Sequence, residues 1–274
     1  KEAYYKRILT GSPVTKSPLD LFSQCAFLHE ELLESGSYYS FKNRYAVMKT
    51  HNFGGRRVQL VHSYQRLDEL AEILKGFSYR VLKEEWLDLP DKVYIKKEIQ
   101  LSKEQKEAYS TIKSAALATL KGKMATAPHV LTQMRRLHQI TCGHLKNDDG
   151  TTTDLKNSRT DELINLLDEV EGKIIIWEKY SHDIEALVKT VSKEYGPETV
   201  VQYYGATSAD DRAKAIKKFQ DPDSKVKYFI GNPQTAGYGI TLTEAGTVIY
   251  FSNGYDLEKR LQSEDRAHRI GQKK

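Results

Sequence analysis

Cysteine is scarce in this chain, and its hydrophobic residues form no long run. Cys25 and Cys142 are the only 2 cysteines among 274 residues, and they lie far apart. No stretch is apolar over the length that a membrane-spanning helix needs, and residues 1–6 do not have the pattern of a secretory signal peptide. We therefore expect two reduced thiols and no membrane partner. We expect an intracellular protein, cytoplasmic if bacterial or phage-borne and nuclear if eukaryotic.

Metal-ligand patterns are equally sparse. Cys25 with His29, and Cys142 with His144, could each supply two ligands, but no further cysteine or histidine follows at ligand spacing. A structural zinc site takes four such ligands. Ordinary packing is therefore the favoured interpretation of these residues, and the sequence predicts no metal site.

The overall composition is that of a globular chain. Hydrophobic residues make up 39% and charged residues 29%, which excludes general disorder and a membrane-embedded fold. At 274 residues the chain exceeds the usual size of a single core, so two folding units are expected. The net charge of +5 favours nucleic acid only weakly, because acidic residues are interspersed throughout.

From about residue 160 onward, short predicted helices and strands alternate. Residues 173–177 are a continuous apolar run, which indicates a strand buried on both faces. Ser181 and Ser208 are placed to cap the helices that follow two of the strands. The predicted helices are 161–170, 181–191 and 208–219, and the predicted strands are 173–177, 199–203, 225–230 and 247–251. Repeated units of this length specify an α/β fold, a parallel sheet with helices on both faces.

Residues 1–155 show a mainly helical pattern instead. The predicted helices are 19–33, 67–74, 102–120 and 128–140, with one alternating strand at 93–101. A capping box of Ser102 and Gln105 opens the third helix. The polar, turn-rich run 146–153 is the predicted linker and hinge. The predicted domains are therefore 1–155 and 156–274.

The C-terminal string holds two arginines, Arg266 and Arg269, three residues apart on a predicted helix. A phosphoryl-transfer enzyme needs a planar, permanently charged guanidinium on a stiff element, aimed at the transferring group. A solvated basic helix end is the alternative interpretation. Because this helix follows a parallel strand, we expect both arginines at the carboxyl edge of the sheet, where open α/β sheets place ligands.

The whole string from Gln262 to Gln272 resembles the last helicase motif of superfamily 2, in the form typical of SWI/SNF-type DNA translocases. Other blocks are similar to those of that family and follow in its order: 7–14 (third motif), 80–92 (end of the helical insertion), 101–109, 174–177 (fourth motif), 205–207 and 237–243 (fifth motif). The resemblance implies that 156–274 form a RecA-like lobe. It also implies that 1–155 hold the end of the first lobe with a mainly helical insertion.

The chain lacks the Gly-Lys-Ser/Thr loop with which such motors bind phosphate. Gly122-Lys123 and Gly172-Lys173 are followed by Met124 and Ile174, which have no hydroxyl group to hold magnesium. The resemblance therefore implies that the parent protein uses ATP and Mg²⁺, and that a missing part of its first lobe supplies the phosphate loop. We expect this chain alone to bind no cofactor tightly and to hydrolyse no ATP.

The resemblance also implies roles for particular residues. Arg266 and Arg269 would face the ATP phosphates. Gln262 would orient the nucleotide or the facing lobe, and Asp265 would touch the nucleotide or hold an arginine in place. Gly237 and Gly239 would lie between nucleotide and DNA. The expected contacts to the phosphates of double-stranded DNA are Thr10, Ser12, Lys179, Ser181, Gly205, Thr207, Thr241 and Thr243. Serine and threonine at such positions are also ordinary caps. The chain departs from the common family pattern at Thr235, Ala236, Thr241 and 255–257.

The leading hypothesis is the C-terminal part of an ATP-dependent double-stranded DNA translocase, a helicase-like motor. A non-catalytic DNA-binding or protein-docking module on the same fold is the second hypothesis, and an RNA helicase is the third. The arginine pair disfavours a pure binding module. The form Asp265-Arg266-Ala267-His268-Arg269 and the long insertion favour DNA translocases over RNA helicases.

Overall fold

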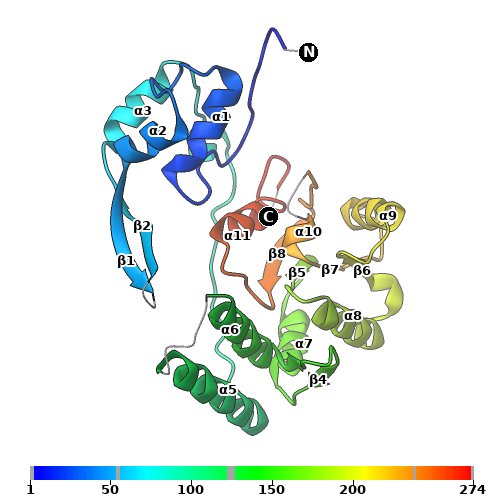
Figure 1. The fold of residues 1–274 in the computed structure, drawn as a ribbon. Coiled ribbons are helices and arrows are strands. Elements are labelled where there is room, and N and C mark those ends of the chain that lie inside the picture. Colours follow the sequence, from blue (N-terminus) through cyan, green and yellow to red (C-terminus); the bar gives the residue numbers. More distant parts are fainter. Residues whose placement is uncertain (1–2, 54–55, 122–126, 237–238, 273–274) are drawn as a thin grey trace. The chain divides into compact units, whose positions relative to one another are not determined.

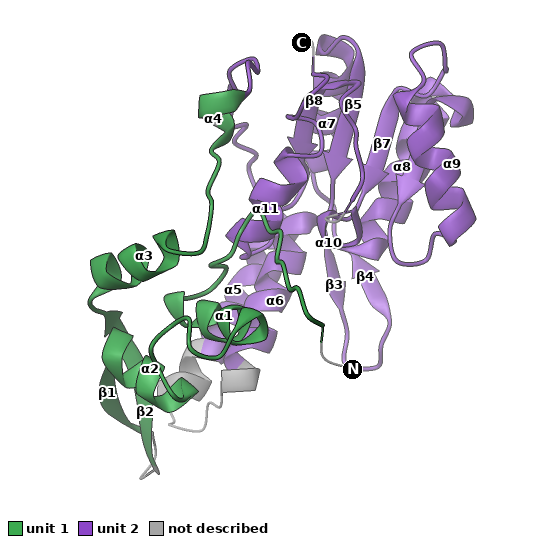
Figure 2. Ribbon diagram, turned by 90° about the horizontal axis from the view of Figure 1, so that it is seen from above, with its two compact units in different colours: residues 1–86 green, residues 87–274 purple. Residues whose placement is uncertain are grey.

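The computed structural model describes residues 3–53, 56–121, 127–236 and 239–272. The chain divides into two compact units, residues 1–86 (unit 1) and residues 87–274 (unit 2), coloured separately in Figure 2. The predicted domain boundary after residue 155 lies inside unit 2 and stays a prediction about the two lobes. None of the described helices is both long enough and apolar enough to cross a membrane.

Unit 1 combines helices with one β-hairpin. Its elements are α1 (Leu21–Leu28), α2 (Tyr38–Tyr45), β1 (Ala46–Phe53), β2 (Arg56–Tyr64), α3 (Leu67–Lys75) and α4 (Lys83–Trp86), after a short 3₁₀ turn at Pro18–Asp20. The predicted helix at 67–74 is confirmed as α3. The predicted helix at 19–33 is too long, because His29 adopts an extended conformation and ends α1 at Leu28. The hairpin, paired from Ala46↔Tyr64 to Phe53↔Arg56, was not predicted.

Unit 2 contains the predicted parallel sheet. Its strands are β5 (Lys173–Trp177), β6 (Val200–Tyr203), β7 (Tyr228–Gly231) and β8 (Ala245–Tyr250), in the order β6-β7-β5-β8 (Figure 1). All three pairings are parallel. The helices that accompany them are α7 (Arg159–Glu169), α8 (Ser181–Tyr195), α9 (Ala209–Gln220), α10 (Pro233–Ala236) and α11 (Leu257–Glu264), with a 3₁₀ turn at Pro197–Thr199.

The pattern of β5 explains why helices cover both faces of this sheet. Ile174 and Ile176 belong to a core cluster that includes α7 and α8 residues such as Leu167 and Leu187. Ile175 and Trp177 belong to a second cluster, with Phe219 of α9 and Phe229 of β7. Because successive strand residues point to opposite faces, one apolar run fills both layers. The predicted α/β fold class is confirmed.

Unit 2 begins with the helices α5 (Lys103–Lys121) and α6 (Ala127–Cys142), which lie close to their predicted bounds. The capping box is formed: the Ser102 N–H donates to Gln105 Oε1 at 3.0 Å, and the Gln105 N–H donates to Ser102 Oγ at 3.1 Å. The cap at Ser208 is also formed, since its Oγ accepts the Asp211 N–H at 3.2 Å. Ser181 is not a cap, because it is the first residue of α8 and the preceding Tyr180 occupies the cap position.

Two further predictions in this part of the chain are wrong. Residues 93–101 form no strand, because no second strand pairs with them. The side chains of Val93 and Ile95 are 84% and 87% exposed, so the alternation of apolar residues serves no sheet face. The polar run 146–153 is not an open linker but the turn of a hairpin, β3 (His144–Lys146) and β4 (Thr152–Asp154). Its polar residues bond to one another, as where the Asn147 N–H donates to the Thr151 carbonyl at 2.8 Å.

Candidate functional site

The two arginines lie on a turn that follows α11 rather than on the helix. Asp256 starts α11 by accepting the Lys259 N–H at 3.3 Å, and the helix ends at Glu264. Residues 265–269, which we call the arginine turn, continue with tighter bonds, and the Ala267 N–H donates to the Glu264 carbonyl at 3.1 Å. The prediction of one helix carrying both arginines is wrong, because the chain turns before the first arginine.

The arginine turn packs against the segment that leads into β8. The Leu242 N–H donates to the Arg266 carbonyl at 2.8 Å, and Arg266 Nη1 donates to the Ile240 carbonyl at 3.4 Å. Gln272 Nε2 donates to the carbonyl of Ala245, the first residue of β8, at 3.0 Å. The arginines therefore lie at the amino end of β8. The predicted position at the carboxyl edge is wrong, since α11 starts near that edge and runs back along the sheet.

Four of the predicted site residues gather here. Arg269 Nη1 donates to Thr241 Oγ1 at 3.2 Å, and Thr243 Oγ1 accepts from Gln220 Nε2 at 3.2 Å. Partial burial lowers the pKa of Arg266 from its ordinary value, and the positive charge of Arg269 lowers it further, while Asp265 opposes both. The two guanidinium groups thus repel each other in a partly desolvated place. A multiply charged anion between them would relieve that repulsion.

The remaining predicted nucleotide residues lie around this turn with different partners. Gln262 donates from Nε2 to Glu258 Oε1 at 2.8 Å, one turn earlier on α11. Asp265 Oδ1 is 3.7 Å from Lys92 Nζ. Gly239 has a φ of +75°, a left-handed conformation that favours glycine. Gly237 lies outside the described residues.

A second group of predicted residues lies at the opposite, carboxyl edge of the sheet. Lys179 follows β5, and its N–H donates to Ser252 Oγ at 3.0 Å, while its carbonyl accepts from Asn232 Nδ2 at 2.7 Å. Its Nζ lies 5.4 Å from the ring centre of Tyr180 and 5.5 Å from that of Tyr255. Ser252 and Asn232 come just after β8 and β7. Sequence reasoning missed both, although polar residues directly after strands were the available signal.

The Gly205–Thr207 turn follows β6 and lies at this same edge. Thr207 Oγ1 accepts the Tyr204 N–H at 3.3 Å, and the Gly205 carbonyl accepts from Arg212 Nη2 at 3.0 Å. Thr207 is buried, so its hydroxyl group stabilises the turn, which is the ordinary structural role of serine and threonine at such positions. Ser181 is the first residue of α8. Thr10 and Ser12 belong to unit 1, where Thr10 Oγ1 accepts the Ser12 N–H at 3.1 Å.

Next to Lys179 in the chain, Glu178 belongs to a buried polar cluster with Cys142, His144 and Asp183, which the sequence did not predict. Burial, together with the charge of Asp183, raises the pKa of Glu178 to about 7. Asp183 Oδ1 is 2.8 Å from His144 Nδ1. Burial raises the pKa of Cys142 to about 12, and Arg159 Nη1 donates to its Sγ at 3.4 Å. Cys142, Glu178 and Asp183 have donor atoms within 4.8 Å of one another, a spacing a metal ion could use. We assign no ion to them, because each of the three side chains already has a partner within the protein: Arg159 for Cys142, the Tyr180 N–H for Glu178 and His144 for Asp183.

The matches to known families follow the order of the motifs. The Helicase conserved C-terminal domain matches residues 156–271, and the SNF2-related domain matches residues 2–146. This chain belongs to the SNF2-related family. The resemblance to the C-terminal part of SWI/SNF-like superfamily 2 proteins is confirmed.

Relatives of this SNF2-related chain include much longer proteins. The chain is 25% identical over 296 residues to Chromatin remodeling factor mit1 of Schizosaccharomyces pombe, covering 98% of this chain and 20% of that protein. It is 28% identical over 292 residues to the human SWI/SNF-related matrix-associated actin-dependent regulator of chromatin subfamily A member 1, covering 97% of this chain and 26% of that protein. The chain therefore spans about a quarter or less of these relatives.

Solved structures agree in fold. The SWI2/SNF2 ATPase core of Sulfolobus solfataricus in complex with dsDNA matches with a TM-score of 0.53 and 27% identity, covering 93% of this chain and 52% of that one. The C-terminal part of the Fun30 ATPase domain matches with a TM-score of 0.53 at 18% identity, covering 68% of this chain and 83% of that one, which bears on the fold alone. The RecA-like lobe expected of the SNF2-related chain is thus confirmed, while the roles of its individual residues stay predictions.

Proposed function

We propose that this chain is the C-terminal part of an ATP-dependent double-stranded DNA translocase and supplies the arginine half of its ATP site. The observation that carries the proposal is the arginine turn, where Arg266 and Arg269 lie within electrostatic range of each other beside Thr241. A module that only binds has no need to bring two guanidinium groups together at a partly buried turn.

The arrangement suits the triphosphate of ATP. Arg266 and Arg269 are the residues that would hold its terminal phosphates, because two planar cations can match the charge that spreads over the phosphoryl oxygens. ATP with Mg²⁺ supplies the phosphoryl group that is transferred to water. The chain's own part is to neutralise the charge that develops, whereas the phosphate loop and the magnesium ligands belong to the missing first-lobe part of the same protein.

The carboxyl edge of the sheet is the proposed DNA side of the lobe. Lys179 supplies a positive charge there, and the adjacent start of α8 presents backbone N–H groups at Ser181. Contacts of this kind bind phosphates and carry no sequence preference. Thr241 and Thr243 lie beside the arginine turn instead, and we propose that they lie between the nucleotide and the DNA. The DNA-bound SWI2/SNF2 core of Sulfolobus solfataricus supports a duplex as the partner.

The test compares the full-length protein with this chain. We expect the full-length protein to hydrolyse ATP when duplex DNA is added, and Arg269→Ala to lose that activity while keeping its DNA affinity. The isolated chain should show no turnover above the matched Arg269→Ala chain. Full-length protein that binds duplex DNA without hydrolysing ATP would support the non-catalytic module instead.

A further inference from the structure

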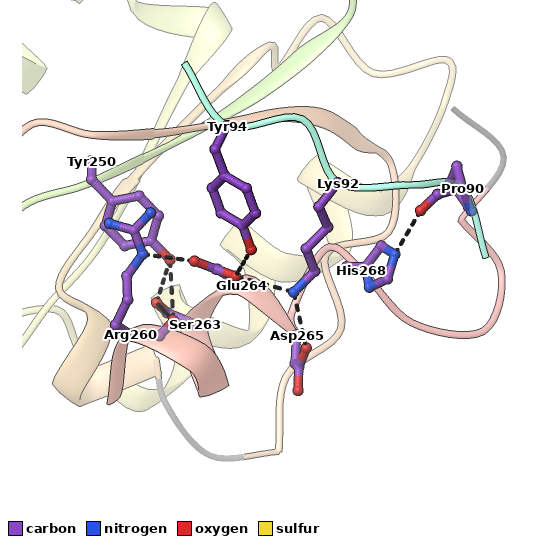
Figure 3. Close-up of polar contacts among 9 residues, drawn as sticks. All are labelled: Pro90, Lys92, Tyr94, Tyr250, Arg260, Ser263, Glu264, Asp265 and His268. Carbon is purple, nitrogen blue, oxygen red and sulfur yellow. Dashed lines mark hydrogen bonds and ion pairs between the residues drawn. The ribbon is translucent and has the colours of Figure 1, made fainter. Parts of the chain in front are cut away.

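The last residue of α11, Glu264, accepts hydrogen bonds from one distant segment of unit 2 and from its own helix. Its carboxylate accepts from Lys92 Nζ at 3.0 Å, from Tyr94 OH at 2.8 Å and from Arg260 Nε at 2.8 Å (Figure 3). Only 10% of the Glu264 side chain is exposed. Burial alone would raise the pKa of this carboxyl group, but the three donors hold it below the ordinary value. Glu264 is therefore a charged anchor immediately before the arginine turn.

The same distant segment also contacts the other side of the arginine turn. Lys92 Nζ is 3.7 Å from Asp265 Oδ1, and His268 Nε2 donates to the Pro90 carbonyl at 2.9 Å. We call residues 90–94 the strap. Its contacts bracket Arg266, because Glu264 and Asp265 precede that residue and His268 follows it. Figure 3 shows the strap lying along this part of the chain.

The strap contributes little to the core of unit 2. Val93 is 84% exposed, and Tyr94 is 67% exposed although its hydroxyl group reaches Glu264. Residues 87–102 form no helix or strand of their own. The contacts of the strap are polar, and they lie at Glu264, directly before the arginine turn, and at Asp265 and His268 within it. Burial of apolar surface does not explain them.

We propose that the strap, through Lys92 and Tyr94, positions the arginine turn and so sets the reach of Arg266 and Arg269 toward a bound phosphate. This proposal rests on the proposed function for its effect on the reaction rate. Its effect on the turn itself does not depend on any reaction. Lys92 and Tyr94 are positioning residues, because their contacts are to Glu264 and Asp265 and not to the arginines.

The experiment uses the full-length protein and two readouts. Lys92→Met removes the charge at nearly constant length, Tyr94→Phe removes only the hydroxyl group, and Lys92→Arg restores a cation. Lys96→Met is the matched control, because Lys96 is 83% exposed and its ion pair is with Glu98, two residues away in the same segment. The first readout is hydrogen exchange of the amides of residues 265–269. The second is kcat and KM for duplex-stimulated ATP hydrolysis.

We expect Lys92→Met to speed hydrogen exchange selectively at 265–269. It should lower kcat by about 10- to 100-fold, with KM within about 2-fold, since a small displacement of a catalytic group has effects of that order. Tyr94→Phe should show a smaller change in the same direction. Lys92→Arg should recover most of the rate, and Lys96→Met should match the wild type in both readouts.

The two readouts separate the two hypotheses. Unchanged hydrogen exchange at residues 265–269 in Lys92→Met overturns the strap proposal. Faster exchange spread evenly over unit 2 also overturns it, because that result indicates general destabilisation. A wild-type protein without ATP hydrolysis overturns the proposed function, and the exchange measurement still decides on the strap. Selective exchange with an unchanged kcat overturns the role of the arginine turn in the reaction.

Discussion

Ionisation of the buried Glu178 side chain opposes folding, and its replacement by glutamine should stabilise the protein at alkaline pH. The side chain is 0% exposed, and burial with the charge of Asp183 raises its pKa from 4.5 to about 7. Glutamine has nearly the same shape. In the variant, the amide oxygen can still accept the Tyr180 N–H, which in the wild type donates to Glu178 Oε1 at 2.8 Å. The amide N–H can donate to the nearby carboxylate of Asp183.

The sign and size follow from the two pKa values. Between pH 4.5 and about 7 the folded protein keeps a proton that the unfolded chain has lost. Wild-type stability from this group is therefore full below pH 4.5 and decreases until the pH passes about 7. At 1.36 kcal/mol per pH unit, the wild type loses roughly 3 kcal/mol over this interval. The cost of burying the glutamine amide does not depend on pH, so it reduces the net gain of the variant at pH 8 to about 1–3 kcal/mol but leaves the pH dependence unchanged.

The assay is urea denaturation at several pH values, followed by the fluorescence of the buried Trp177 in the adjacent strand. The stability of Glu178→Gln minus that of the wild type should increase by roughly 3 kcal/mol between pH 4.5 and pH 8. Glu171→Gln, at an exposed position just before the same strand, should show no such increase. A difference that stays constant with pH, or a variant less stable than the wild type at pH 8, would refute the reasoning.

Three further outcomes are expected. In the full-length protein, Arg269→Lys should lower kcat by about 10³-fold or more without changing duplex affinity, because lysine keeps the charge but lacks the planar guanidinium group. A retained kcat would indicate that Arg266 is the catalytic arginine instead. Duplex binding by this chain should weaken with salt at a slope of roughly −0.9 per phosphate contact and show no sequence preference, which titration of two unrelated duplexes at several salt concentrations would check. Cys142, buried and with a pKa raised to about 12, should resist a thiol-specific disulfide reagent until urea unfolds the protein, and rapid labelling of the folded protein would contradict that burial.

Local sequence patterns were sufficient to predict the sheet of unit 2. The apolar run at 173–177 specifies β5 because both of its faces are buried, and the Ser102/Gln105 capping box marks the start of α5. The hairpin of β1 and β2 was missed because its strands mix polar and apolar residues without a strict alternation and are defined by pairing with each other. The strand predicted at 93–101 was wrong for the opposite reason. Its residues alternate correctly, but a strand also needs a partner.

The structure brings some of the residues named from the sequence together, but not at the position that the sequence predicted, and their roles stay predictions. The motif string identified the arginines, and the structure brings Arg266, Arg269, Thr241 and Thr243 into one region. Helical periodicity could not show that α11 ends at Glu264, because contacts with residues far away in the sequence, such as Lys92 and Leu242, hold the turn that follows. The error about the edge of the sheet was avoidable. A helix that follows a parallel strand runs back, so its last residues arrive at the amino edge.

The return of α11 places the arginine turn and Lys179, the two proposed contact regions, at opposite ends of one rigid body. The Lys179 side and the arginine side lie at opposite ends of neighbouring strands, and the 5 residues of β5 span roughly 16 Å at about 3.3 Å per residue. The close-packed layers on both faces of the sheet resist bending, so the two ends can move only together. A lobe that tilts about its sheet acts as a lever. A displacement of the arginine end toward a phosphate then carries the Lys179 end the other way, by a distance that the length of the strands determines.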